Sequence, residues 1–504
     1  MFFSNLKPLL NIVDSFNNLL HGTNTNETTI KEKEDVMEEI LNDTEIDRIK
    51  LLIIENMDNY IEDNILYFSS IHFHDDLKLM IMNDIYILLK NIYNYESLYN
   101  DISSIYDDIS HYYFNNTYPY RSYPHTFIRI NPIQNTITPK INYIKNKPQP
   151  TQRTNEWYLF RYNLITASSA WKAFKSQSTI NQLIVEKCTP INVEKYNSVN
   201  TNSALHHGNK YEEVSVMYYE HKYNTKVADF GCIQHDTHSF LGASPDGINV
   251  DPQSNIYGRM LEIKNPISRE ITGIPKEEYW IQMQLQMEAC NLNECDFLET
   301  SFKEYEDEEE FIKDGDFTYT IEGQLKGIII YFMKDNKPLY EYMPVYYTSE
   351  QYDKWLDDIM DKHNNITWIK NIYWRLENCS CVLVLRNKQW FKSAIIQIEQ
   401  VWNIIEKERI SGFDHRLPKK NTRTIRSNSL SEKTSEPINK LNAKDEPNVK
   451  DKSNVKDEPN AKDEPNTKDK PNAKDDNEST NTQPNCLINV SDLKKQIIFI
   501  DTTT

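Results

Sequence analysis

Apolar residues recur at helical spacing in the N-terminal part of the chain and again in residues 349–410. Residues 2–20 (FFSNLKPLLNIVDSFNNLL) and 79–93 (LMIMNDIYILLKNIY) repeat apolar side chains every three or four positions, with an acidic stretch between them. This pattern predicts a helical accessory region over residues 1–112. Residues 349–410 have a similar pattern, with five tryptophans interpreted as packing residues, and predict a helical C-terminal extension over residues 346–410.

The middle of the chain, residues 153–345, alternates helical and strand patterns. In GRMLEIKNP (258–266), alternate residues of a strand share a face, so Glu262 and Lys264 point the same way and Ile263 points the other. Between Asp246 and Glu262 lie the turn signals Asp-Pro and Ser-Asn. They predict two neighbouring antiparallel strands that bring the two carboxylates together.

Residues 113–152 are basic and aromatic, and the sequence has no acidic residue between Asp108 and Glu156. Basic side chains neutralise phosphates and aromatic rings stack on unpaired bases, so this segment could guide a DNA strand. The interpretation that we favour is a proline-broken basic and aromatic linker that crosses the surface. The sequence leaves both interpretations open.

The C-terminal part is polar and repetitive. A six-residue repeat rich in Asn, Lys, Asp and Pro runs from Asn442 to Asn477, and it offers no apolar face to bury. We therefore expect a disordered tail over residues 411–485, followed by a short apolar segment at 486–504.

Charge and cysteine usage narrow the class of protein. The 504 residues include 56 Lys and Arg against 75 Asp and Glu, a net charge of -19, so global charge does not hold this protein on nucleic acid. Seven cysteines without a CxxC pair argue against both a disulfide framework and a zinc site. Residues 2–20 have no cleavage site and no run of about 18 apolar residues. We expect a soluble, intracellular protein, in the host cytoplasm or nucleus if it is viral.

Acidic residues provide the candidate chemistry. Asp246 follows a proline in FLGASPDGINV, where an aspartate alone is commonly a turn former, but Glu262 would lie beside it. Two carboxylates and a carbonyl oxygen suit Mg²⁺ or Mn²⁺. Upstream, Gly208 and Glu212 share a helix face, and downstream Gln282 and Gln286 share another.

The order of these motifs resembles the PD-(D/E)xK nuclease superfamily, and more specifically the phage lambda exonuclease and YqaJ-like viral recombinase family. The similarity includes RYNLITASSAWKAF (161–174), GNKYE (208–212), LGASPDG (241–247), LEIKNP (261–266) and QMQLQM (282–287), and it covers residues 153–345. It implies an α/β fold with a restriction-endonuclease-like core, in which helices flank a central mixed sheet.

The resemblance also implies an activity and its residues. It implies a Mg²⁺-dependent deoxyribonuclease, with Mn²⁺ as a substitute, that degrades DNA from 5′ to 3′ in viral-type recombination, repair or replication. On this basis the metal ligands are Asp246, Glu262, the Ile263 carbonyl and Glu212, and Lys264 and Gln282 complete the catalytic set. Arg161 and Ser168 match the pocket for a terminal 5′-phosphate. The family often has proline after the helical glutamate, where this chain has Glu213, so either Glu212 or Glu213 could face the metal.

Two other functions stay open at this stage: an endonuclease or junction-resolving nuclease of the same superfamily, and a catalytically silent DNA-binding scaffold. The partners expected are linear duplex DNA ends and a single-strand annealing protein, together with further copies of this chain in a homo-oligomer.

Overall fold

The computed structural model describes residues 41–418, except 94, 130–133, 153, 192–199 and 202, and also strand β12 (Ile497–Phe499). The predicted disordered tail lies outside these residues from position 419 onward. The backbone of β12 pairs antiparallel with β1 (Phe127–Arg129). None of the helices in the described ranges is long and apolar enough to cross a bilayer.

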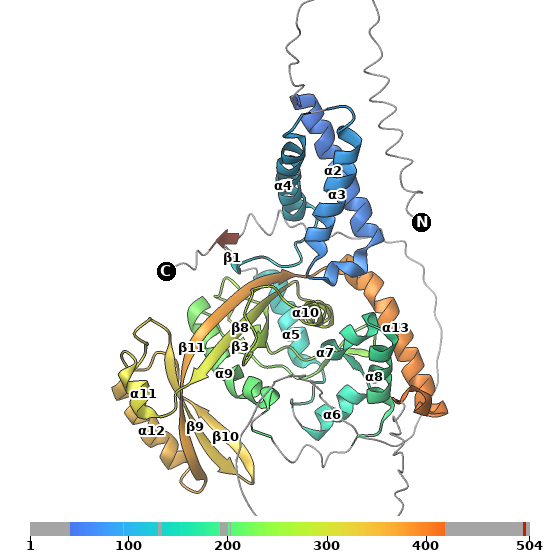
Figure 1. Ribbon diagram of the computed structural model, residues 1–504. Coiled ribbons are helices and arrows are strands. Elements are labelled where there is room, and N and C mark those ends of the chain that lie inside the picture. The colour runs from blue at the N-terminus through green and yellow to red at the C-terminus, as the bar shows by residue number, and fades with distance from the viewer. Residues whose placement is uncertain are drawn as a thin grey trace, which may run out of the picture.

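The N-terminal region is helical, as predicted, from residue 43 onward, and its helices stand together at one end of the molecule (Figure 1). The helical pattern predicted over residues 2–20 lies outside the described residues. They are α2 (Asp43–Asp63), η2 (Ile65–Ser69), α3 (Phe73–Leu89) and α4 (Leu98–Asn116). Asn42 caps α2 with a capping box in which Glu45 reaches back to the cap backbone. The buried apolar face of these helices belongs to the same core cluster as α10 and α13, so the region is packed onto the core rather than tethered to it.

A seven-stranded mixed sheet forms the centre of the molecule, in the order β10-β9-β11-β8-β7-β6-β3. The strands are β3 (Val227–Ala228), β6 (Gly247–Asn249), β7 (Met260–Lys264), β8 (Glu294–Glu304), β9 (Lys326–Lys334), β10 (Lys337–Tyr342) and β11 (Thr367–Leu385). Neighbours are antiparallel except β7 and β8, which are parallel and joined through α10 (Glu277–Cys290). A second, three-stranded sheet consists of β2 (Ile165–Thr166), β5 (Leu241–Ala243) and β4 (Ile233–Gln234).

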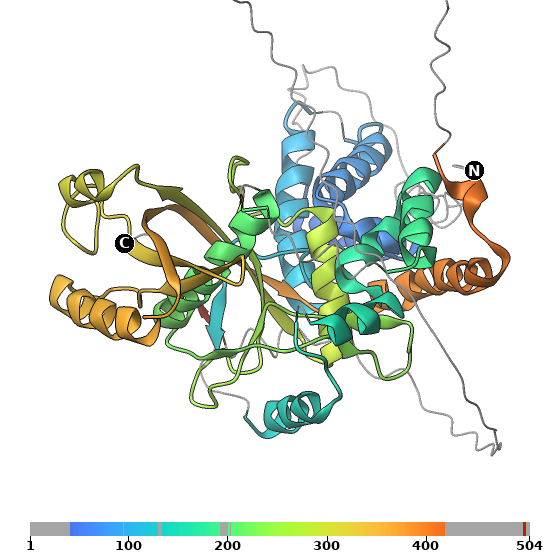
Figure 2. The same ribbon diagram turned by 90° about the horizontal axis from the view of Figure 1, so that it is seen from below.

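Helices cover both faces of the large sheet, which confirms the α/β architecture predicted from the sequence (Figures 1 and 2). On one face, Phe297 and Val382 pack with α10. On the other, Leu261, Ile263 and Leu298 pack with α9. The flanking helices are α5 (Gln134–Asn146), α6 (Asn155–Tyr162), α7 (Ala167–Ala170), η3 (Trp171–Phe174), α8 (Gln177–Cys188), α9 (Ala204–Tyr223), α11 (Glu308–Lys313), α12 (Ser349–Lys362), α13 (Lys388–Ser411) and η5 (Asp414–Arg416).

The prediction of helix throughout residues 349–410 is wrong. Between α12 and α13 lies the 19-residue strand β11, which pairs with both β8 and β9. Its side chains alternate, with Ile372, Trp374 and Leu376 in one cluster beneath α9. This period of two, together with hydrogen bonding on both edges, outweighs the spacing of the tryptophans. Trp374 is a core residue as expected, whereas Trp368 is 48% exposed.

Residues 113–152 do not cross the surface as a linker. The aromatic side chains of Tyr118, Tyr123 and Phe127 are buried, so they are not available to stack on bases. Arg121 is also buried: its Nε donates to the Ser69 carbonyl (3.0 Å) and its Nη2 to the Pro275 carbonyl (2.7 Å). This cation therefore joins the N-terminal helices to the segment that leads into α10.

His74 lies in the same junction, and it makes that junction sensitive to acid. Its Nε2 accepts the backbone N–H of Arg121 (3.1 Å), and burial, together with the charge of Arg121, lowers the His74 pKa to about 4. A folded-state pKa below the unfolded value means that stability is complete above about pH 6.5 and decreases as the pH falls towards 4.

We expect unfolding free energy to fall by about 1–2 kcal/mol over that range because of His74, allowing for its partial exposure. The measurement is denaturant unfolding at pH 7 and pH 4.5. His74→Gln keeps an acceptor for the Arg121 N–H but does not titrate, so it should reduce the difference between the two pH values by this amount. An unchanged difference would contradict the assignment.

Candidate functional site

Asp246 lies at the end of the β6–β7 pair, as the turn signals predicted. It directly precedes β6, and Gly247 is opposite Leu261 in the antiparallel ladder. The Asp246 Oδ2 accepts the backbone N–H of Ile263 at 2.8 Å, so its carboxylate extends across to β7. Gly247 is required by space rather than by a turn, because a Cβ there would lie 2.2 Å from the Val227 side chain of β3.

Glu262 and Lys264 lie on one face of β7 and form an ion pair with each other. Ile263 faces the opposite side, where it packs with Tyr219 and Leu298. Glu262 is 0% exposed, and Lys264 is half-buried, with the ring of Tyr279 centred 5.1 Å from its Nζ. The structure therefore confirms the prediction that Glu262 and Lys264 lie on the same face of one strand.

The electrostatics of this pair reflect crowded negative charge. Burial, and then the charge of Asp246, raises the pKa of Glu262 above its usual range, although Lys264 acts in the opposite direction. Burial alone would lower the pKa of Lys264, but Glu262 and Asp246 together raise it. Lys264 is therefore a retained cation, which agrees with an electrostatic role rather than that of a general base.

Gln286 is the glutamine that contacts the carboxylates. Its Nε2 donates to the Glu262 Oε2 at 2.7 Å and approaches the Ser244 carbonyl at 3.4 Å. Gln282, the glutamine expected from the resemblance, lies one turn earlier on the same helix and is half-buried. The shared face of Gln282 and Gln286 was visible in the sequence, but which of the two contacts Glu262 was not.

Helix α9 is held at the end of β7 by Asn265, the residue that follows Lys264. The Asn265 Nδ2 donates to the Gly208 carbonyl (2.9 Å), and its Oδ1 accepts from the Ser215 hydroxyl (2.8 Å). Nothing lies within 4 Å of a Cβ built at Gly208, so no close approach of another segment requires glycine there. Glu212 is half-buried and Glu213 is exposed, which favours Glu212 as the inward residue.

The acidic residues do not converge as one set of three. Among the residues that the structure describes, no group of three or more His, Cys, Asp or Glu side chains is placed to hold a metal ion. Asp246 and Glu262 are brought together through β6 and β7, whereas Glu212 approaches from α9. The six described cysteines are free.

Arg161 and Ser168 also come together, as expected for an anion-binding pair. The Arg161 Nη2 lies 3.4 Å from the Ser168 Oγ, and its Nη1 lies 3.5 Å from the Ser244 Oγ. The guanidinium lies over the ring of Trp157, 4.1 Å from its centre. Burial lowers the pKa of Arg161, and the buried Lys187, which donates to its carbonyl (2.9 Å), has a pKa lowered to about 8 by burial.

Ser244 joins the two parts of the site. Its hydroxyl lies beside Arg161 and its carbonyl beside Gln286, while Asp246 is only two residues further along the chain. Ser244 belongs to the motif LGASPDG, but the sequence alone indicates no role for it. Its signal was its place in that motif, whereas nothing in the sequence pointed to Trp157 or Lys187.

A protein-family comparison matches this region. Residues 156–293 match the model of the YqaJ-like viral recombinase domain. This segment is similar to that domain. It contains Arg161, Ser168, Glu212, Asp246, Glu262, Lys264 and, on α10, Gln282 and Gln286.

Matches to individual proteins cover more of this chain than the match to the YqaJ-like domain does. An uncharacterized protein, R354, of Acanthamoeba polyphaga mimivirus is 32% identical over an alignment of 309 residues, and the match covers 53% of this chain and 54% of that protein. The chain thus matches about half the length of this curated relative. Among solved structures, an alkaline exonuclease from Laribacter hongkongensis is 19% identical with a TM-score of 0.30, and the match covers 51% of this chain and 94% of that one. Its complex with dAMP matches at 20% identity and the same TM-score and coverage.

Proposed function

We propose that this chain is a Mg²⁺-dependent deoxyribonuclease that degrades linear duplex DNA from the 5′ end. The YqaJ-like domain supports the reaction class. The observation that carries the proposal is that Ser244 joins Arg161 to the carboxylate site, which consists of Asp246, Glu262, Lys264 and Gln286. A pocket for a terminal phosphate beside a hydrolytic centre would register the scissile bond from the DNA end.

The residues present suit a hard divalent cation. A buried Glu262 beside Asp246 concentrates negative charge that Lys264 only partly compensates, and oxygen donors are what Mg²⁺ and Mn²⁺ prefer. Asp246, Glu262 and the Ile263 carbonyl would hold the ion, with Glu212 contributing directly or through water. A bound Mg²⁺ would supply an acidified water and neutralise charge on the phosphate.

The protein side chains would position the substrate around that site. Lys264 would stabilise the negative charge that develops on the phosphate oxygens, since its ammonium stays protonated. Gln286, with Gln282 one turn away, would orient the Glu262 carboxylate or the substrate. Arg161 and Ser168 would bind the dianionic 5′-phosphate through a guanidinium and a hydroxyl.

The test compares DNA forms in the presence of Mg²⁺ or Mn²⁺. We expect hydrolysis of linear duplex DNA that carries a 5′-phosphate, slower hydrolysis of a 5′-hydroxyl end, and none of closed circular DNA. Cleavage of circles or of branched junctions at the same rate would show an endonuclease or junction-resolving enzyme. Absence of hydrolysis with either cation would leave the DNA-binding scaffold.

The end pocket has its own prediction. In Arg161→Ala, the preference for a 5′-phosphate over a 5′-hydroxyl should fall by about tenfold, because a charge-assisted contact to the phosphate is lost. The measurement is the ratio of initial rates on the two ends. Arg409→Ala is the matched control, since Arg409 lies over Tyr162 at the same 4.1 Å but donates only to carbonyls and to Asn163. An equal loss of preference in both variants would contradict the pocket.

A further inference from the structure

A second buried carboxylate, Glu299, lies next to the candidate site on β8. It is opposite Lys264 in the parallel β7–β8 ladder, so the two side chains share the face of the sheet that α10 covers. Glu299 is 1% exposed. Its Oε1 accepts from Arg269, whereas its Oε2 is buried and has no hydrogen-bond partner among the described residues.

Tyr279 of α10 lies between the two cations of this face. The Lys264 Nζ lies 5.1 Å from the centre of its ring, and the Arg269 guanidinium carbon lies 5.8 Å from the same centre. Burial raises the pKa of Glu299, and the charges of Arg269, Lys264 and Lys276 oppose that rise. A buried carboxylate with one unsatisfied oxygen thus lies within the electrostatic range of Lys264.

The Lys264–Glu262 ion pair poses a problem for cation binding. The oxygen of Glu262 that pairs with Lys264 is one that a divalent cation would require, so a cation and the ammonium compete for it. An ammonium that loses its partner in a buried site carries a desolvation cost unless another acceptor is at hand. Glu299 is the carboxylate beside it on the same sheet face.

We propose that Glu299 is a positioning residue that accepts the Lys264 ammonium when Glu262 takes up a divalent cation. The inference rests on the proposed function, because it concerns the same cation site. In this role the Oε2 of Glu299, which has no hydrogen-bond partner among the described residues, would accept from Lys264. The contact would also keep Lys264 close to the position of a scissile phosphate.

The simpler role for Glu299 is to anchor the loop between β7 and α10 through Arg269. That loop lies on the sheet, since a Cβ at Gly273 would lie 3.2 Å from the Ser380 Oγ, and Ser380 is opposite Glu299 in the ladder. The two roles separate experimentally. Glu299→Gln and Arg269→Gln both break the same ion pair, but only Glu299→Gln removes the acceptor for Lys264.

The experiment measures Mn²⁺ affinity of the full chain by electron paramagnetic resonance, without DNA. We expect Glu299→Gln to weaken Mn²⁺ binding by about tenfold, the size of one charge-assisted hydrogen bond, and Arg269→Gln to leave it within about twofold of wild type. In a Lys264→Met background no ammonium competes with the cation, so adding Glu299→Gln should change Mn²⁺ affinity by less than about twofold.

Each other outcome overturns a defined statement. Equal weakening in Glu299→Gln and Arg269→Gln, or an undiminished effect of Glu299→Gln in the Lys264→Met background, would show that Glu299 only anchors the loop. An unchanged affinity in Glu299→Gln would also overturn the inference while leaving the proposed function in place. Failure of the wild-type chain to bind Mn²⁺ at all would overturn both.

Discussion

Glu262→Gln is expected to reduce DNA hydrolysis by about 10³-fold while leaving the protein at least as stable as wild type. The rate falls because a neutral amide cannot hold the divalent cation or stabilise the charge of the transition state. Stability is retained because glutamine has the same shape, and because burial and the charge of Asp246 raise the Glu262 pKa in spite of the Lys264 ion pair, so the site disfavours the charged carboxylate on balance.

The opposite signs of these two effects make the prediction specific. The measurements are single-turnover hydrolysis of 5′-phosphorylated linear duplex DNA and the thermal midpoint without added metal. Lys264→Met should show a similar loss of rate. A Glu262→Gln protein that hydrolyses DNA within tenfold of the wild-type rate would exclude this carboxylate from catalysis. A lower thermal midpoint in Glu262→Gln would contradict the predicted effect on stability.

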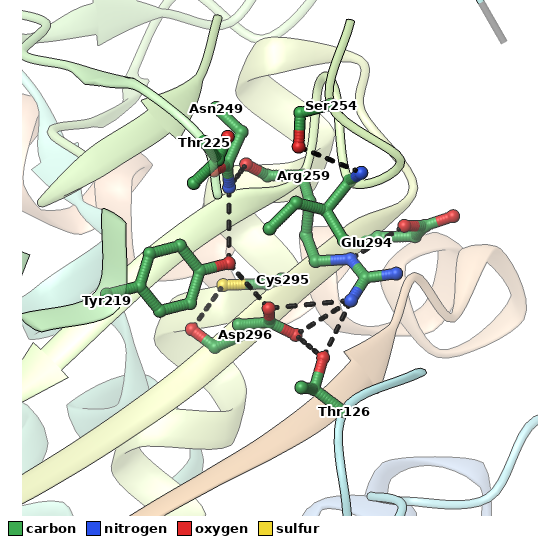
Figure 3. Close-up of polar contacts among 10 residues, drawn as sticks. Thr126, Tyr219, Thr225, Asn249, Ser254, Arg259, Glu294, Cys295 and Asp296 are labelled. Atoms are coloured by element: carbon green, nitrogen blue, oxygen red, sulfur yellow. Dashed lines mark hydrogen bonds and ion pairs between the residues drawn. The ribbon is translucent and has the colours of Figure 1, made fainter. Parts of the chain in front are cut away.

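Arg259→Met is expected to destabilise the protein by about 3–5 kcal/mol, because it leaves two buried carboxylates without their cation. Arg259 is 0% exposed; its Nε donates to Glu294 (2.9 Å) and its Nη1 lies 3.3 Å from Asp296 (Figure 3). Thr126 and Tyr219 also donate to Asp296, both at 2.6 Å. The network thus joins the residue directly before β7 to β8, α9 and the segment before β1.

Equilibrium unfolding in urea measures this change, at a pH where the carboxylates are charged. Lys313→Met, which breaks the exposed pair with Glu309, is the control and should cost less than about 1 kcal/mol. Adding Asp296→Asn to Arg259→Met should recover part of the loss, because it removes one of the stranded charges. A loss in Arg259→Met no larger than in the control would show that the network contributes little.

The sequence was sufficient to predict the part of the site that depends on short-range geometry. Asp246 and Glu262 are separated by recognisable turn residues, and the two-residue period of a strand places Glu262 and Lys264 on one face. The order of these short motifs carried the resemblance that implied the α/β fold class. These features depend on residues within about twenty positions of one another, where local periodicity and turn chemistry dominate.

The features that sequence reasoning missed depend on contacts between distant segments. Arg121 lies in the basic, aromatic segment that could contact DNA, but its guanidinium donates to the carbonyls of Ser69 and Pro275. Asn265 and Ser244 acquire their roles from α9 and Arg161, and β11 is a strand because β8 and β9 lie on either side of it. A side chain's partner, rather than its type, decides such cases.

The β7–β8 ladder also limits how this protein can be divided. The segment that matches the family model ends at residue 293, one residue before β8 begins, yet all five residues of β7 pair with β8. A recombinant fragment cut at that boundary would expose an open strand edge and the apolar underside of α10. The smallest unit suited to expression therefore extends at least through α13, because that helix belongs to the same core cluster as α10. The family match covers the candidate site but only part of the foldable unit.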